Sequence, residues 1–98
     1  MTQAERTVKI ENRYGLHARP AAEFVKLSSR FSAKVTVEKD GLEVNGKSIM
    51  GVMMLAAECG SSLTITAVGE DATDAVNALA GLVEKRFGES ETDYEVEH

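Results

Sequence analysis

The segment GLHARPAAEF, residues 15–24, brings a histidine, an arginine and the chain's single proline within four positions. Proline is accepted in the first turn of a helix, where backbone amides lack an intrahelical acceptor, so a helix is expected to begin beside His17. The backbone N–H groups of Ala18 and Arg19 would then point out of the helix end, and such an end binds anions. The Arg19 guanidinium adds a permanent charge whose planar donors suit phosphate oxygens.

The imidazole of His17 would share this electropositive setting. The helix end and Arg19 both disfavour the protonated ring, so we expect a neutral, nucleophilic imidazole near pH 7. A neutral imidazole can accept a phosphoryl group on nitrogen. The product would carry about two negative charges beside the helix-end amides and the guanidinium. Pro20 also disfavours a helical backbone for the residue before it, which predicts an unusual pose for Arg19.

Other interpretations of these residues stay open. A histidine at a helix start is often a cap or an exposed polar residue. A metal site has little support, because the second histidine is the terminal His98 and no cluster of Cys, His and acidic residues has ligand spacing. A Ser/His/Asp triad is not excluded by composition, but no nucleophile-elbow pattern supports one. The residues alone therefore leave a phosphoryl carrier and a simple helix cap as alternatives.

The elements that would position His17 follow from hydrophobic periodicity. In chain order they are a strand over residues 7–11, a helix over 18–31, a hairpin over 34–46 that turns at Asp40-Gly41, a helix over 48–60, a strand over 62–68 and a helix over 70–87. Each strand has one convincing apolar face. This pattern predicts an α+β fold in which helices cover one face of a sheet and the other face is exposed to solvent.

The expected core is aliphatic, because aromatic residues make up only 5% of the chain. The single cysteine, Cys59, cannot form an internal disulfide, is expected to be at least half-buried, and favours a reducing cytoplasm. The apolar faces comprise Val8, Ile10, Ala21, Phe24, Val25, Ser28, Val35, Val37, Leu42, Val44, Val52, Leu55, Leu63, Ile65, Ala67, Ala72, Ala75, Val76, Leu79, Leu82 and Val83.

Ninety-eight residues suit one domain over residues 1–87, followed by an acidic, flexible tail over 88–98. The tail holds five acidic residues and no Lys or Arg, so it accounts for the whole net charge of −5 and leaves residues 1–87 neutral. A neutral domain gives no support for nucleic-acid binding. No apolar run is long enough to insert into a membrane, and the N-terminus lacks a signal-peptide pattern.

Two segments together resemble a known family. GLHARPAAEFV, which begins at Gly15, and NGKSIMGVMMLAA, which begins some thirty residues later at Asn45, resemble HPr, the histidine-containing phosphocarrier family of the bacterial phosphoenolpyruvate-dependent phosphotransferase system. The resemblance covers residues 6–87. It implies an open-faced β-sandwich with a four-stranded antiparallel sheet, in the order 1-4-2-3, and three helices on one face.

The resemblance also implies roles for three residues. His17 would be phosphorylated on Nδ1 by enzyme I, which draws on phosphoenolpyruvate, and would pass the phosphoryl group to enzyme IIA domains. Arg19 would pair with that group. Ser48 would be a regulatory serine, phosphorylated with ATP by HPr kinase/phosphorylase in organisms that have it. Such a protein is a carrier and not an enzyme, needs no cofactor, and is expected to be a monomer.

Ser48 also precedes an apolar helix, where a serine side chain is a good N-cap worth about 1 kcal/mol. The surface that docks partners is expected to combine one stripe of the helix over 18–31 with exposed apolar residues of the helix over 48–60. Its expected members are Arg19, Ala22, Lys26, Ser29, Lys47, Ile49, Met50 and Met53. Periodicity alone leaves core packing open as an alternative for these positions.

Tyr14 departs from the family pattern, in which a small polar residue often stands before the site. Whether its side chain contacts the imidazole therefore stays open. The second segment is shared too widely to separate sugar uptake from a regulatory, nitrogen-type or incomplete system. A small α/β interaction domain without phosphotransfer is an alternative of another class, which the pairing of His17 with Ser48 disfavours. An independent enzyme has the least support, because no second catalytic group accompanies His17 and Arg19.

Overall fold

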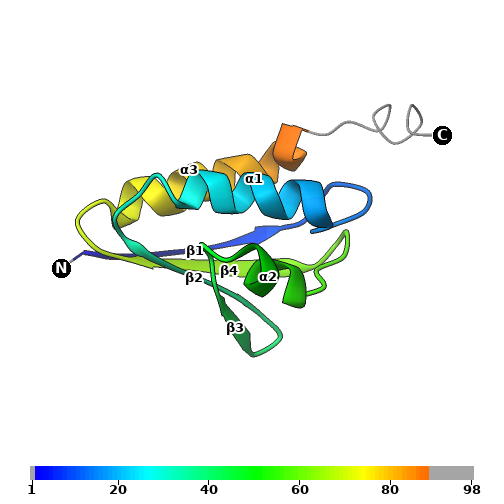
Figure 1. The fold of residues 1–98 in the computed structure, drawn as a ribbon, viewed down its shortest axis with the longest axis horizontal. Coiled ribbons are helices and arrows are strands. Elements are labelled where there is room, and N and C mark those ends of the chain that lie inside the picture. The colour runs from blue at the N-terminus through cyan, green and yellow to red at the C-terminus, as the bar shows by residue number, and fades with distance from the viewer. Residues whose placement is uncertain (1, 89–98) are drawn as a thin grey trace.

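A computed structural model of the chain describes residues 2–88 as a four-stranded antiparallel sheet covered on one face by helices (Figure 1). The strands lie in the order β1-β4-β2-β3, and the expected fold class is confirmed. The elements are β1 (Gln3–Lys9), α1 (Ala18–Ser28), β2 (Lys34–Lys39), β3 (Leu42–Asn45), α2 (Ile49–Met54), β4 (Ser62–Val68), α3 (Ala72–Glu84) and a short 3-10 turn, η1 (Arg86–Gly88). The expected tail over 88–98 lies outside the described residues, apart from Gly88.

β4 lies inside the sheet, between β1 and β2, and shows the alternation that its sequence predicts. Leu63, Ile65 and Ala67 are fully buried under the helices. The residues between them face the other side of the sheet, where the Thr64 hydroxyl lies 3.1 Å from that of Thr7 on β1. The sheet is therefore apolar toward the helices and polar on its outer face.

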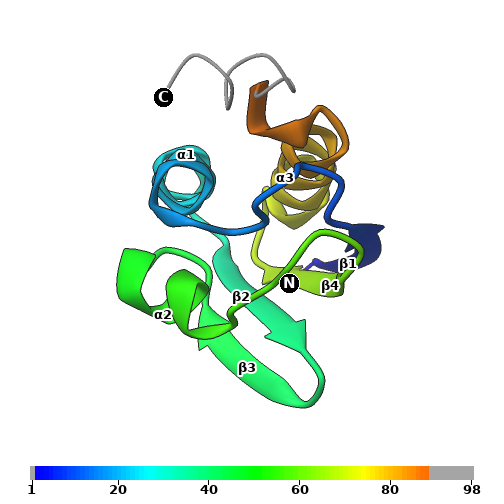
Figure 2. The same ribbon diagram turned by 90° about the vertical axis from the view of Figure 1, so that its right-hand side faces the viewer.

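α1 and α3 lie side by side over the sheet (Figures 1 and 2). Phe24 of α1 and Leu79 of α3 are among the large buried side chains, and most of the expected apolar stripe is in the core. Val25 and Leu82 are half-buried and pack against that core. Leu42 was expected in the core and is 45% exposed, so that prediction is wrong. It begins the edge strand β3, directly after the hairpin turn.

Three further predictions are corrected by the structure. β1 begins at Gln3, well before the expected residue 7, because pairing with β4 continues through polar residues that lack an alternating pattern. α2 ends at Met54 and not near residue 60, since Ala56 adopts a left-handed φ of 49° that an α-helix does not accept. Cys59 is exposed rather than buried, because this early end puts it in a loop.

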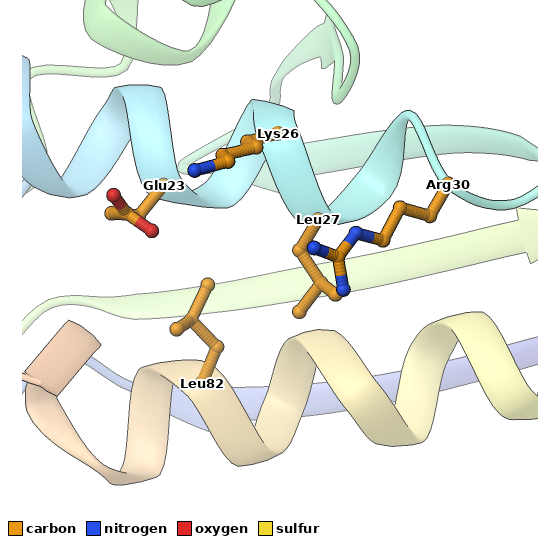
Figure 3. A pocket seen from close by; sticks show the side chains of 5 residues that line it. All are labelled: Glu23, Lys26, Leu27, Arg30 and Leu82. Atoms are coloured by element: carbon orange, nitrogen blue, oxygen red, sulfur yellow. The ribbon is translucent and has the colours of Figure 1, made fainter.

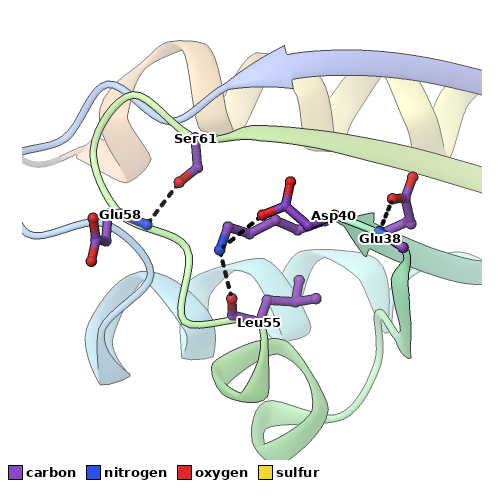
Figure 4. Close-up of polar contacts among 7 residues, drawn as sticks. Glu38, Asp40, Leu55, Glu58 and Ser61 are labelled. Carbon is purple, nitrogen blue, oxygen red and sulfur yellow. Dashed lines mark hydrogen bonds and ion pairs between the residues drawn. The ribbon is translucent and has the colours of Figure 1, made fainter.

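Both ends of α2 are held by side chains. The Ser48 hydroxyl accepts a hydrogen bond from the Gly51 amide at 3.0 Å, so the expected N-cap is confirmed. At the other end, the Lys39 ammonium donates to the Leu55 carbonyl at 3.3 Å (Figure 4). A cation suits the carbonyl end of a helix. These contacts stabilise a helix of only six residues.

Asp71, at the start of α3, connects this helix to the loop that enters β2. Its carboxylate accepts hydrogen bonds from the backbone amides of Ser32 and Ala33, both at 2.8 Å. The hydrogen bond from Ser32 is the main cause that lowers the pKa of the Asp71 carboxyl below its ordinary value, although partial desolvation opposes it. The ionised carboxylate therefore stabilises the folded chain.

We predict that Asp71→Asn lowers the melting temperature at neutral pH, because an amide cannot accept both hydrogen bonds. The stabilisation by Asp71 is complete above the pKa of an unfolded Asp and is lost as pH falls through the lowered folded pKa. The difference between wild type and variant should therefore shrink in strong acid. Thermal denaturation followed by circular dichroism over a pH series measures it. Glu70→Gln is the control, because it removes a negative charge from the neighbouring residue. An equal loss of melting temperature in both variants would contradict the role of Asp71.

Candidate functional site

The loop that leads into His17 is hydrogen-bonded to the segment that follows α2. The Leu16 amide donates to the Ala57 carbonyl at 2.9 Å. Further back, the Ile10 amide donates to the Ser61 carbonyl, and the Gly60 amide donates to the Ile10 carbonyl, both at 2.8 Å. The sequence places these two segments more than forty residues apart. The bonds therefore fix the approach to His17 relative to α2.

Gly15 is the position at which the two segments come closest. Its φ is +67°, and a Cβ atom there would collide with the Ala57 carbonyl oxygen. The buried Asn12 side chain donates to the Gly15 carbonyl at 2.7 Å and closes the turn. The sequence interpretation missed both residues as parts of the site. An Asn three positions before a Gly is a turn signal that could have indicated them.

His17 occupies the N-cap position of α1, as expected. Its backbone is extended, with φ −75° and ψ −176°, and its carbonyl accepts the Ala21 amide at 3.0 Å. Its imidazole does not cap the helix by a hydrogen bond. The first turn of α1 holds no acidic residue, so no carboxylate there offsets the positive helix end. The His17 side chain therefore does not cap α1, and the interpretation of this histidine as a simple helix cap is not supported.

Arg19 and Pro20 lie in the first turn of α1, with Arg19 exposed and Pro20 buried. The unusual backbone pose expected for Arg19 is wrong, because Ala18, Arg19 and Pro20 are all helical. The bias against a helical residue before proline is modest, and here the first helical hydrogen bond and the burial of Pro20 outweigh it. The arginine thus stands two residues from His17 on an exposed helix end.

Tyr14 contacts the imidazole, which answers the question its position raised. The Tyr14 and His17 ring centroids are 6.3 Å apart with an interplanar angle of 84°, an edge-to-face arrangement. The Arg13 guanidinium carbon lies 5.5 Å from the Tyr14 ring centroid, within range of a cation–π interaction. Tyr14 is 55% exposed, so it shields one side of the histidine without burying it.

The predicted docking residues divide between α1 and α2, which lie next to each other beside the same edge of the sheet (Figure 2). α2 exposes apolar side chains, and the sequence interpretation missed Met54 among them. Lys47 is half-buried and donates to the Phe31 carbonyl at 2.6 Å, so its charge is partly used within the fold. Exposed on α2 are Ile49, Met50, Met53 and Met54. On α1, Arg19 and Lys26 are exposed and Ala22 is half-buried, and Ser29, directly after α1, is exposed.

Among residues 2–88, no group of three or more Cys, His, Asp and Glu side chains could hold a metal ion. Within the same residues, no helix has the length and apolar content needed to cross a membrane.

Comparison with known proteins matches residues 4–85 to the family model "PTS HPr component phosphorylation site". The phosphocarrier protein HPr of Treponema pallidum is 46% identical over 84 residues, which are 86% of this chain and 96% of that protein. The crystal structure of HPr-C-His from Thermoanaerobacter tengcongensis has a TM-score of 0.86 and 48% identity, covering 89% of this chain and 98% of that one.

A second kind of relative is Crh of Bacillus subtilis, described as a catabolite repression protein and solved as a domain-swapped dimer. It has a TM-score of 0.69 and 47% identity, covering 81% of this chain and 91% of that one. Matches of this extent to both sequence and fold show the family, whose members are phosphocarriers and not enzymes. The chain with His17 at the start of α1 belongs to the HPr family of phosphotransferase-system phosphocarrier proteins.

Proposed function

We propose that this chain carries a phosphoryl group on Nδ1 of His17, received from phosphorylated enzyme I and passed to enzyme IIA domains for sugar uptake. The observation that carries the proposal is the position of His17 at the N-cap of α1, two residues before the exposed Arg19. In the first transfer, the Nδ1 lone pair forms a bond to phosphorus while the bond to the donor breaks, and the donor keeps that electron pair. The second transfer repeats the step, with His17 as the leaving group.

The phosphorylated ring would carry about two negative charges at neutral pH. The amides of Ala18 and Arg19 and the Arg19 guanidinium supply donors for these oxygens. One arginine and one helix end form a moderate clamp. The clamp stabilises the phosphoryl group yet allows its release to the next acceptor, as a carrier requires.

Partners would dock on the surface shared by α1 and α2, next to His17. Its apolar part is formed by Ile49, Met50 and Met53 of α2, whose flexible thioethers adapt to partners of different shape. Ala22 and Lys26 extend this surface along α1. Lys47 adds a positive charge, although its ammonium group already donates a hydrogen bond to the Phe31 carbonyl. The exposure of this apolar surface supports a docking role over core packing. We also propose that the chain acts as a monomer, although solved Crh is a dimer.

Ser48 is our proposed regulatory site, phosphorylated with ATP by HPr kinase/phosphorylase. The serine already caps α2 through Gly51, and a phosphate at a helix start is favoured by the helix dipole. Phosphorylation should therefore leave the fold intact and change partner binding. The similarity to Crh favours a regulatory carrier as the second candidate.

Incubation with phosphoenolpyruvate and active enzyme I should add one acid-labile phosphoryl group, measured by intact mass. His17→Ala should abolish this gain, because the accepting nitrogen is lost. The matched control is His98→Ala, which removes the other histidine of the chain and should be phosphorylated normally. No transfer to the wild-type chain from a demonstrably active cognate enzyme I would overturn the proposal.

Phosphorylation of Ser48 should weaken binding to enzyme I by about tenfold or more, since it adds charge beside the docking surface that meets an acidic partner. Isothermal titration of the modified and unmodified chains measures this effect. Thr73→Asp adds a negative charge in the first turn of α3 and should bind normally. The start of α3 lies at the other end of the helical layer from the start of α1 (Figure 1). Equal affinity of the unmodified and phospho-Ser48 chains would refute the regulatory role.

Gly15→Ala should both destabilise the fold, by more than about 1 kcal/mol, and slow phosphoryl transfer roughly tenfold to a hundredfold by displacing His17. Gly41→Ala is the matched control: Gly41 also has positive φ, but a Cβ atom there meets no heavy atom within 4 Å. It should lose stability through backbone strain alone and keep its transfer rate. Denaturant melts and transfer kinetics distinguish the two, and an unchanged rate in Gly15→Ala would contradict the positioning argument.

A further inference from the structure

A groove lies between α1 and α3, on the side of α1 away from α2 (Figures 2 and 3). Its volume is about 160 Å³. Leu27 and Leu82 point toward one another across it, while Lys26 of α1 and Arg30, in the turn directly after α1, carry positive charge. Among the described residues, Glu23 is the one acidic side chain in its lining. The groove therefore has two basic side chains on its α1 side and the apolar Leu82 on its α3 side.

Small residues lie next to Leu82 on α3, outside the lining of the groove itself. Ala78 and Gly81, which precede Leu82 on α3, are half-buried like Leu82 itself. A Cβ atom on Gly81 would meet no heavy atom within 4 Å, so there is open space beside this turn. Small residues here leave room for an extended backbone to lie along α3.

Residues 89–98, ESETDYEVEH, have a pattern that fits these two sides. Acidic residues occupy every second position from 89 to 97, and Tyr94 and Val96 stand between the last three of them. In an extended segment, alternate residues face opposite sides, so all five carboxylates would share one face. The other face would carry Tyr94 and Val96. We propose that residues 89–98 dock in the α1–α3 groove of their own chain, with carboxylates on Lys26 and Arg30 and the apolar face on α3.

The two basic residues of the groove lie close together in the chain. Lys26 is on α1, and Arg30 is in the turn directly after α1, where its amide donates to the Leu27 carbonyl at 3.1 Å. Carboxylates two residues apart on an extended chain are about 6.6 Å apart. Two neighbouring carboxylates of the tail can therefore reach the flexible side chains of Lys26 and Arg30.

The chain can reach the groove from where the described residues end. Gly88 closes η1, which lies near the start of α1 (Figure 1). Ten extended residues span about 33 Å, and α1, at 1.5 Å per residue, spans about 16 Å. Glu23 lies toward the η1 end of the groove and would repel the first acidic residues. The later residues, 93–97, are therefore the ones we place on Lys26 and Arg30.

The distribution of charge along the chain supports residues 89–98 as the segment that fills the groove. Residues 1–87 are neutral and residues 88–98 carry the whole net charge of −5. Docking in a groove of the same chain is helped by an effective concentration in the millimolar range, so even weak pairing is populated. Lys26 is also a proposed partner contact, so the docked segment would compete with acidic partners. The docking itself does not depend on the proposed phosphotransfer.

A spin label at the end of the chain tests the proposal. The full-length chain carrying Cys59→Ser and His98→Cys is labelled with a nitroxide, and broadening of backbone amide signals is measured by NMR. We expect broadening of residues 22–30 and 78–82 at low salt, and its loss at high salt, where the Debye length is short. Broadening elsewhere, or an even distribution over the surface, would overturn the proposal.

Variants show which contacts are used. Arg30→Gln should reduce the broadening about two- to fivefold, as expected for the loss of one exposed ion pair. Lys9→Gln removes an equal charge at the end of β1 and should leave it unchanged. A tail of the same composition with its five acidic residues contiguous should also bind less. Equal effects of Arg30→Gln and Lys9→Gln would refute the groove as the site. Broadening that appears only between a labelled and an isotope-labelled copy would refute docking within one chain.

Discussion

The hydrogen bond between the Leu16 amide and the Ala57 carbonyl is the contact on which the arrangement of the site depends. It joins the turn before α1 to the turn after α2, and Gly15 permits it because no side chain separates the two backbones. α1 also packs directly against α2, and this hydrogen bond adds a link between the turns at their ends. With it, His17 at the start of α1 and the exposed methionines of α2 keep one fixed relation, so a partner that binds α2 meets the imidazole in a defined place.

Much of the fold could be predicted from the sequence, because β4 and α3 each bury one regular apolar face. The alternation of Leu63, Ile65 and Ala67 fixed a strand whose observed bounds equal the expected ones. The stop of α2 could not be predicted in this way. LAA, residues 55–57, reads as good helix, yet Ala56 turns left-handed so that Leu55 and Ala57 are both buried. Tertiary packing determines this conformation of Ala56, and local helix propensity does not reflect tertiary packing.

The site, too, could be predicted from the sequence only in part. The types and spacing of His17, Arg19 and Pro20 were sufficient to predict the start of α1, and the N-cap role of Ser48 followed from its position. The spacing of Asn12 and Gly15 could have indicated a turn, but the contact of Tyr14 with the imidazole could not be predicted, because it depends on how that turn folds. Here a single backbone conformation, at Gly15, decides which side chains surround the imidazole. The position of His17 at a helix start could be predicted from residue types, but the side chains around it depend on the folded turn.

The outer face of the sheet is polar along β4 and β1, with Thr7 and Thr64 at its surface. The exposed apolar side chains near His17 all belong to the opposite, helical side. On the proposed function, donor and acceptor both dock on this one side, so the carrier must leave one before it binds the other. Throughput would then be set by how quickly each complex dissociates, which favours brief encounters over tight ones. A sheet with one apolar face would thus impose an order on the two encounters.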